Sequence, residues 1–273
     1  MKALTYHLKI HYTLRIAAAM CFIGHGAFGI ITKAIWCNYF AVFGIGKLMA
    51  FRIMPFLGTF DILMGILLLM KPFRVIAAWL VIWGIMTALC RPLSGEPVAE
   101  FFERAGNYGV PLCLLILAGG IPFNFRRLFS IIDLNEPVSE KSLANVKTIL
   151  RITVFLVLVG HGWLNLIQKP GLINQYSAIG FSNPVNVSIL AGVFEFMAAL
   201  AVLMKPVRPL LMAFLIWKMG TELFYPHFEI FEWIERGGSY GSILALWLFL
   251  DPVRQKKYNY SSGSCRLAVN NHA

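Results

Sequence analysis

Long apolar runs alternate with short polar segments along the whole chain. A run of about 18 to 22 apolar residues is long enough to cross a hydrocarbon layer of about 30 Å as an α-helix. Such runs lie near residues 13–32, 51–70, 74–91, 107–125, 149–167, 188–204, 208–225 and 238–253. The pattern therefore predicts an all-α integral membrane protein with eight transmembrane helices.

The composition agrees with this prediction. Apolar residues make up 58% of the chain and charged residues only 14%, whereas soluble domains are about 45–50% apolar and about 25% charged. The formal net charge is +11. No basic stripe is interleaved with aromatic residues, so nucleic acid is not an expected partner. The lipid bilayer is the expected one.

The distribution of basic residues predicts the orientation. The terminal tails, the central linker and the turns after the second and sixth predicted helices contain 16 of the 24 Lys and Arg residues. The other side has 8, with Lys218 among them. Because cytoplasmic loops carry the excess of positive charge, both termini are predicted to be cytoplasmic.

The chain also contains an internal repeat. Gly24–Gly26 (Gly-His-Gly) recurs as Gly160–Gly162 at an offset of 136, and Glu103–Gly109 (Glu-Arg-x-Gly-x-Tyr-Gly) recurs as Glu235–Gly241 at an offset of 132. The second and third predicted helices match at an offset of 134. Each copy contains four of the predicted spans. Because four is an even number, both copies should enter the membrane in the same direction.

Each copy is predicted to be an up-down-up-down four-helix bundle, because the turns within it are short. The fold class is therefore two parallel four-helix-bundle repeats. The predicted organisation is a first repeat over 1–128, a cytoplasmic linker over 129–148, a second repeat over 149–253 and a cytoplasmic tail over 254–273.

Polar side chains recur at one depth of both repeats. Each lies 9 or 10 residues from a basic residue at the cytoplasmic end of its predicted helix, or roughly 15 Å into the membrane. Polar groups inside a membrane are costly and are functional candidates by default. The residues are His25, Asp61 and Trp83 in the first repeat, and His161, Glu195 and Trp217 in the second.

An imidazole beside a carboxylate supports several interpretations. The two groups can simply satisfy each other and fix the packing of the bundle, or they can relay a proton or bind a small ligand. His25 and His161 could also be the two axial ligands of a haem. One His and one carboxylate in each bundle supply too few ligands for a non-haem metal.

A second polar layer is predicted nearer the extracytoplasmic end. These residues would line the mouth of a pocket: Thr87, Glu103, Arg104, Thr221, Glu235 and Arg236. Tyr108 and Tyr240 are candidates for cofactor contacts, or for anchors at the lipid headgroups. No span has a visible break by Gly or Pro at matching central positions, which argues against an ion-coupled transporter.

The five cysteines form no Cys-x-x-Cys pair, so a thiolate metal site is not expected. The spacing leaves open a disulfide between Cys37 and Cys90 on the extracytoplasmic side. The chain also has no Gly-x-Ser-x-Gly, Walker or His-Glu-x-x-His motif, and no reaction is assigned on motifs.

Each half resembles the DoxX-like family of small four-span bacterial membrane proteins. The resemblance rests on an Arg that opens the first span, on Gly-x-x-Glu in the second span, and on a basic residue that opens the third after a short turn. The Gly-x-x-Glu motif is Gly192–Glu195, with Gly58–Asp61 as its counterpart. The resemblance covers most of residues 13–125 and 149–253.

The resemblance implies a place in the bacterial inner membrane and an association with redox complexes, because one family member is the small subunit of a thiosulfate:quinone oxidoreductase. We therefore expect a redox-associated subunit linked to the quinone pool, with quinone or haem as candidate cofactors and subunits of a redox complex as partners. The alternatives are a non-catalytic assembly or partner-binding protein, and a transporter of protons or small molecules.

Overall fold

The computed structural model describes residues 6–121, 124–133, 138–226 and 229–251. Over these ranges the chain forms thirteen helices and no β-strand. Five helices are long and apolar enough to cross a membrane: α1 (Tyr6–Ile30), α3 (Lys47–Met70), α4 (Arg74–Leu93), α8 (Glu140–Leu166) and α10 (Pro184–Met204). These helices fit the predicted α-helical membrane protein.

The other three predicted spans are shorter helices. They are α6 (Ala105–Leu117), α11 (Arg208–Glu222) and α13 (Gly237–Phe249), and the 13 residues of α6 or α13 rise only about 20 Å. Each of these two helices follows a shorter one on the same path, α5 (Ala99–Glu103) before α6 and α12 (Ile230–Glu235) before α13.

The chain leaves helical geometry at Arg104, between α5 and α6, and at Arg236, between α12 and α13. These positions match in the two repeats. The predicted fourth spans, 107–125 and 238–253, begin just after these positions, so the interruption was not part of the prediction. The interruption lies in the Glu-Arg-x-Gly motif and needs no proline, which is why the sequence did not reveal it.

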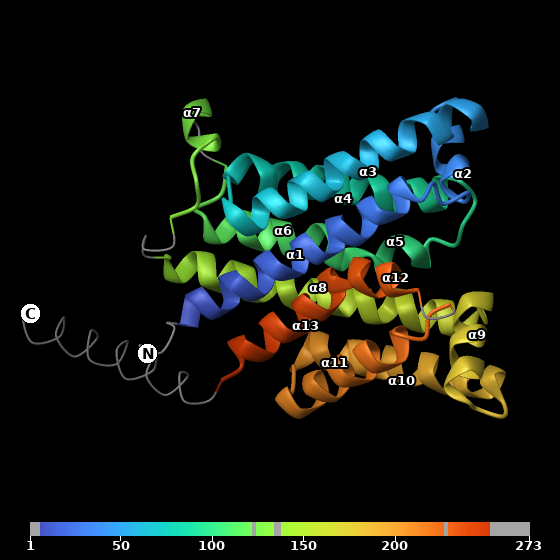
Figure 1. Ribbon diagram of the computed structural model, residues 1–273. Coiled ribbons are helices and arrows are strands. Elements are labelled where there is room, and N and C mark those ends of the chain that lie inside the picture. The colour runs from blue at the N-terminus through green and yellow to red at the C-terminus, as the bar shows by residue number, and fades with distance from the viewer. Residues whose placement is uncertain (1–5, 122–123, 134–137, 227–228, 252–273) are drawn as a thin grey trace, which may run out of the picture.

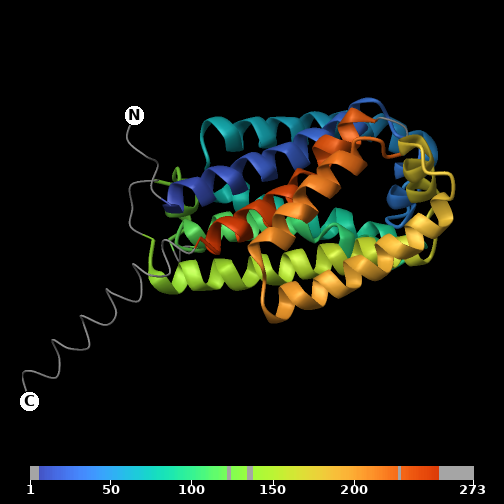
Figure 2. The same ribbon diagram turned by 90° about the horizontal axis from the view of Figure 1, so that it is seen from below.

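The helices are arranged around a central group of four. Figures 1 and 2 show α1, α6, α8 and α13 in the middle, with α3 and α4 on one side and α10 and α11 on the other. Short helices complete the two ends: α2 (Trp36–Ala41), α7 (Phe125–Leu128) and α9 (Pro170–Ile179). One apolar core runs through both halves and includes Leu14, Leu114, Leu150 and Leu246.

The two halves of the chain, which correspond to the predicted repeats over 1–128 and 149–253, pack closely against each other. Helix α13 packs more extensively on α1 than on α8, and α6 packs more extensively on α8 than on α1. The last helix of each half thus packs more on the first helix of the other half than on the first helix of its own half. The sequence predicted a four-helix bundle in each half, and this crossing between the halves was not part of that prediction.

Glycines make this crossing physically possible. A Cβ atom on Gly24 of α1 would lie 2.3 Å from the backbone nitrogen of Glu235, and one on Gly160 of α8 would lie 2.2 Å from that of Glu103. Where α6 crosses α13, a Cβ on Gly106 would lie 2.4 Å from the carbonyl carbon of Gly238. Small residues allow helix backbones to approach this closely in membranes.

One arginine in each half joins two neighbouring helices. The Arg15 Nε of α1 donates to the Leu68 carbonyl at 2.6 Å, and Arg151 of α8 donates to the Met204 carbonyl at 3.1 Å. Those carbonyls belong to the last turns of α3 and α10. Carbonyl groups in the last turn of a helix have no hydrogen-bond partner within that helix. Arg15 and Arg151 therefore cap the C-terminal ends of α3 and α10.

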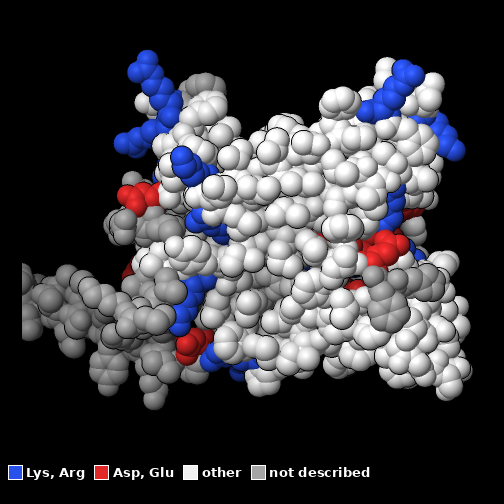
Figure 3. Space-filling model, in the orientation of Figure 1, with Lys and Arg blue, Asp and Glu red and all other residues white. Residues whose placement is uncertain are grey.

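The outer surface suits an apolar environment. Figure 3 shows a broad middle region of one face without Lys, Arg, Asp or Glu, while charged side chains gather toward the two ends. Large apolar side chains are strongly exposed on the outer helices, including Phe56 at 78%, Leu190 at 70% and Ile216 at 66%. Apolar exposure of this extent indicates contact with lipid.

An alanine substitution, which adds one methyl group, tests the close contact between the halves. Gly24→Ala is expected to destabilise the protein by about 1–3 kcal/mol or to prevent folding, because the new carbon meets backbone that cannot move aside. The measurement is the unfolding temperature in detergent. Gly220→Ala in α11 is the control, since a Cβ there meets nothing within 4 Å and helix propensity favours Ala. Equal effects of the two substitutions would contradict this close contact.

Candidate functional site

The first half contains a histidine–carboxylate pair between α1 and α3. His25 Nδ1 lies 2.7 Å from Asp61 Oδ2. Asp61 is completely buried, whereas the His25 side chain keeps 16% of its surface exposed. The two helices meet closely because Gly26 and Gly58 face each other. The predicted neighbourhood of His25 and Asp61 is thus confirmed by a hydrogen bond.

The second half contains the equivalent pair between α8 and α10. His161 Nδ1 lies 2.7 Å from both carboxylate oxygens of Glu195. Asn165 adds a hydrogen bond from its Nδ2 to Glu195 Oε2 at 3.1 Å, and its own Oδ1 accepts from the Tyr176 hydroxyl at 3.0 Å. Sequence reasoning did not identify Asn165 or Tyr176, although an amide one helical turn after a histidine was a usable signal.

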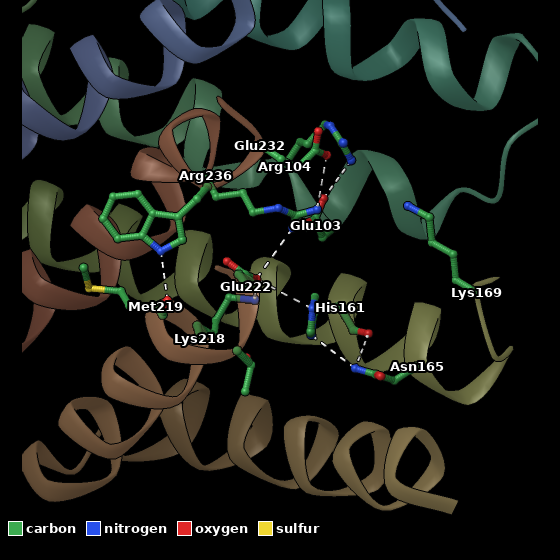
Figure 4. Close-up of polar contacts among 12 residues, drawn as sticks. Glu103, Arg104, His161, Asn165, Lys169, Lys218, Met219, Glu222, Glu232 and Arg236 are labelled. Atoms are coloured by element: carbon green, nitrogen blue, oxygen red, sulfur yellow. Dashed lines mark hydrogen bonds and ion pairs between the residues drawn. The ribbon is translucent and has the colours of Figure 1, made fainter. Parts of the chain in front are cut away.

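The second ring nitrogen of His161, Nε2, lies near a buried ion pair (Figure 4). His161 Nε2 lies 3.6 Å from Glu222 Oε1, and Lys218 Nζ lies 2.5 Å from the same oxygen. Lys218 and Glu222 are each only 1% exposed. Lys218 was counted from the sequence among the charges outside the membrane, and the structure instead places it inside the protein.

Ion pairs continue from this site across the junction of the halves (Figure 4). Arg236 of the second half pairs with Glu103 of the first, and lies 3.6 Å from Glu222. Arg104 is 2.7 Å from both Glu100 and Glu103. In the second half the two predicted polar layers are therefore connected, because His161 continues through Glu222 and Arg236 to the charges of the Glu-Arg motif.

The depth predicted for the Glu-Arg motif needs correction. The backbone of Glu235 touches Gly24, the neighbour of His25, and the backbone of Glu103 touches Gly160, the neighbour of His161. The motif therefore lies level with the histidines and not nearer the extracytoplasmic end. The fourth span is interrupted at this level, which residue counting along an unbroken helix could not reveal.

A cavity opens beside His25. Its volume is about 280 Å³, and its wall is mainly apolar and aromatic, including Trp36, Tyr39, Phe40, Leu57, Trp83 and Met86. The Trp36 ring lies on the His25 ring with centroids 4.5 Å apart and planes at 31°. Within the described part of the chain, His25 Nε2 has no hydrogen-bond partner. We call this space the His25 cavity.

A second cavity of about 440 Å³ adjoins the first and shares Trp36, Tyr39, Arg91, Arg104 and Glu235 with it. We call it the vestibule. It lies at the end of the molecule that carries α2 and α9 (Figure 1), and its wall contains several charged side chains.

Two lysines of the vestibule keep their charge through nearby acids. Burial alone would lower the pKa of Lys33, but Glu232, with an oxygen 2.9 Å from Nζ, together with Glu235 and Glu229 outweighs burial and raises the pKa. The pKa of Lys169 is raised against burial by Tyr225 and by Glu100, whose oxygen lies 2.6 Å from Nζ. Both ammonium groups are therefore charged members of ion pairs.

The two histidine sites differ because their neighbours differ. At an offset of 134, Lys218 and Glu222 correspond to Gly84 and Ala88. At an offset of 136, Asn165 corresponds to Gly29. The polar side chains that enclose His161 thus have small counterparts around His25, so the first half has space where the second is filled.

The remaining predicted site residues divide in the same way. Trp83, Thr87, Arg104 and Glu235 line the His25 cavity. Trp217, the counterpart of Trp83, is 36% exposed on α11, and its predicted depth stays a prediction.

Three other candidates lie away from the His25 cavity. The Tyr108 ring stacks on Phe101 at 5.4 Å, and the buried Tyr240 ring lies 5.6 Å from Trp233. Thr221 donates to the Trp217 carbonyl at 2.8 Å, a hydrogen bond within α11. These positions favour packing roles for all three residues.

Haem ligation by both histidines is not favoured by this geometry. His161 presents Nε2 to Glu222 and does not line the His25 cavity. In the described ranges, no group of three or more His, Cys, Asp or Glu side chains could hold a metal ion. Cys37 and Cys90 are free thiols, as are Cys21 and Cys113, and Cys265 lies outside the described residues.

Comparisons of the chain with protein-family models, with curated proteins and with solved structures give no match.

The buried ion pair of the second half can be tested by substitution. Lys218→Met is expected to destabilise the protein by about 3–5 kcal/mol, because it removes the closest positive charge from buried Glu222. The double variant Lys218→Met with Glu222→Leu should recover most of this loss, because apolar residues can replace a buried ion pair. The measurement is equilibrium unfolding in mixed micelles. A double variant as unstable as the sum of both single variants would contradict this role.

Proposed function

We propose that the chain crosses a bacterial inner membrane eight times, as two four-span units in the same direction with both termini in the cytoplasm. The five long apolar helices and the uncharged middle of the surface support the membrane environment. Helices α5 and α12 lengthen the short fourth spans, and α11 supplies the seventh. The repeated motifs and the 16 to 8 distribution of basic residues support the orientation.

We further propose that the His25 cavity binds the ring of a quinone, and that the protein serves the quinone pool as part of a membrane redox complex. The observation that carries this proposal is His25 itself. Its Nδ1 is held by Asp61 while its ring lines an apolar cavity with Nε2 unpartnered in the described chain. Such a site can hydrogen-bond a polar group at the edge of an apolar ring.

The wall of the cavity supports a flat, lipid-soluble ligand. Trp36 already stacks on the imidazole, and Trp83 and Phe40 add aromatic surface. Ligand pockets are mostly apolar with a few polar groups that fix orientation. A carboxylate behind a histidine sets its tautomer and orientation, so Asp61 is a positioning residue in this proposal. The resemblance to the DoxX-like family points to the same ligand class.

In this proposal the second half supports the fold. His161, Glu195, Asn165, Lys218 and Glu222 are joined by hydrogen bonds and ion pairs. This network makes the packing specific, and it leaves His161 only 2% exposed. The two repeats therefore have different roles in spite of their shared motifs.

One observation favours a second candidate, a transporter of protons or small molecules. The fourth spans are interrupted at matching positions, Arg104 and Arg236, in the middle of the protein. Discontinuous helices with half-helix N-termini inside the membrane are typical of secondary transporters. This candidate would place the vestibule and the His25 cavity on the substrate path.

The quinone proposal predicts that decylubiquinone binds the purified protein and quenches its tryptophan fluorescence, since Trp36 and Trp83 line the cavity. His25→Ala should weaken binding about tenfold or more, the loss expected for one good hydrogen bond. Asp61→Asn should weaken it less, because the ring remains but its tautomer is no longer fixed.

His161→Ala is the matched control, because His161 does not line the cavity. It should lower the unfolding temperature and leave the affinity for decylubiquinone within about twofold. Absence of binding by the wild-type protein would contradict the proposal, as would equal losses of affinity for His25→Ala and His161→Ala.

A further inference from the structure

The wall of the His25 cavity differs between its inner and its outer side. The inner side belongs to α1, to α12, and to α6 with the residue before it, and its side chains are polar: His25, Arg104, Asn107 and Glu235. The outer side belongs to α3, α4 and the segment before α3, and it contains apolar side chains: Phe43, Ile45, Leu57 and Met86. The cavity therefore fits a ligand that is polar at one end and hydrocarbon at the other.

Three further polar residues of the wall are engaged elsewhere. Thr87 donates to the Trp83 carbonyl of its own helix at 3.0 Å. The Tyr39 hydroxyl donates to Glu96 at 2.5 Å, and Arg91 lies 3.3 Å from the same carboxylate. Because Glu96 lines the vestibule, these contacts hold Tyr39 and Arg91 away from the apolar side of the cavity.

Helices α3 and α4 leave a crevice beside this apolar side. They follow each other in the chain, but α3 packs extensively on α1 and only slightly on α4. Leu57 of α3 and Met86 of α4 are half-buried and both line the cavity. Phe43 lines it too and is 58% exposed. We call the space bounded by Phe43, Leu57 and Met86 the α3–α4 crevice.

The crevice lies on the outer surface of the protein. Helices α3 and α4 are on the outside of the central group (Figures 1 and 2), and Ile85 and Leu89 of α4 are exposed next to Met86. Nearer the other end of the two helices, the Phe60 ring meets the Trp79 ring edge-on, with centroids 5.8 Å apart. The crevice therefore ends at this aromatic contact and borders the apolar surface that suits lipid.

Arg52 indicates the depth of the crevice. It is exposed on α3, five residues before Leu57, and an exposed arginine in a membrane places its charge at the headgroups. Leu57 thus lies about 7.5 Å deeper along the helix, which is inside the hydrocarbon layer. The vestibule offers a different environment, because Lys33, Lys169 and several acids line it.

We propose that the ring ligand enters the His25 cavity sideways from the lipid, through the α3–α4 crevice, and that its hydrocarbon tail stays in the crevice when the ring is bound. This inference rests on the proposed function and names the substrate class as quinones with a long alkyl or isoprenoid tail. The polar edge of the ring meets His25, and the tail passes between Leu57 and Met86. A ligand on this route never brings its tail into the charged vestibule.

The test fills the crevice and compares two ligands of the full-length protein by calorimetry in detergent. They are decylubiquinone and the analogue in which a methyl group replaces the decyl chain. Leu57→Trp and Met86→Trp should each weaken decylubiquinone about tenfold or more, because the indole takes the space of the tail and overpacking opposes binding. Each should change the affinity for the methyl analogue by no more than about twofold. Each variant is compared with the wild-type protein for the same ligand, so partitioning into detergent cancels.

Ile35→Trp is the matched control, because Ile35 lines the vestibule and not the His25 cavity. It should leave both affinities within about twofold. The inference would be overturned, with the proposed function standing, if the crevice variants weakened both ligands equally or neither, or if Ile35→Trp selectively weakened decylubiquinone. Binding of neither ligand by the wild-type protein would overturn both.

Discussion

A carboxylate that leaves water must be paired, because an unpaired buried charge costs several kcal/mol. This constraint organises the interior, where the described chain buries seven acids: Asp61, Glu100, Glu103, Glu195, Glu222, Glu232 and Glu235. Six of them have a partner at ion-pair distance. Because Arg236 reaches from the second half to Glu103 of the first, pairing these acids also joins the two halves. The seventh acid, Glu235, has no partner at ion-pair distance among the described residues, but it shares the wall of the His25 cavity with Arg91 and Arg104.

The same constraint explains how two similar halves acquire different roles. Around His161 the second half adds Asn165, Lys218 and Glu222, and these occupy the interior as hydrogen-bonded or ion-paired groups. Around His25 the first half has glycine and alanine at the corresponding positions, so a cavity remains beside an equally well-held imidazole. Stability and ligand binding can thus be divided between the repeats, with one copy filled and the other open.

Much of this structure could be predicted from the sequence. The apolar runs indicated the helices, and equal spacing from basic residues correctly placed His25 beside Asp61 and His161 beside Glu195. The crossing of the halves could not be predicted, because short turns establish only which consecutive helices are neighbours. Trp36 was missed because it lies in a predicted loop, and its contact with His25 depends on how α2 packs against α3 and α4.

The central claim is that only the first half holds a ligand site, and photoaffinity labelling tests it most directly. An azido-substituted ubiquinone analogue, irradiated with the protein in membranes and followed by mass spectrometry of the peptides, should label the walls of the His25 cavity, residues 36–45 and 83–91. The corresponding residues of the second half, 172–181 and 217–225, should remain unlabelled. Equal labelling of both halves, or labelling confined to the second, would contradict the account.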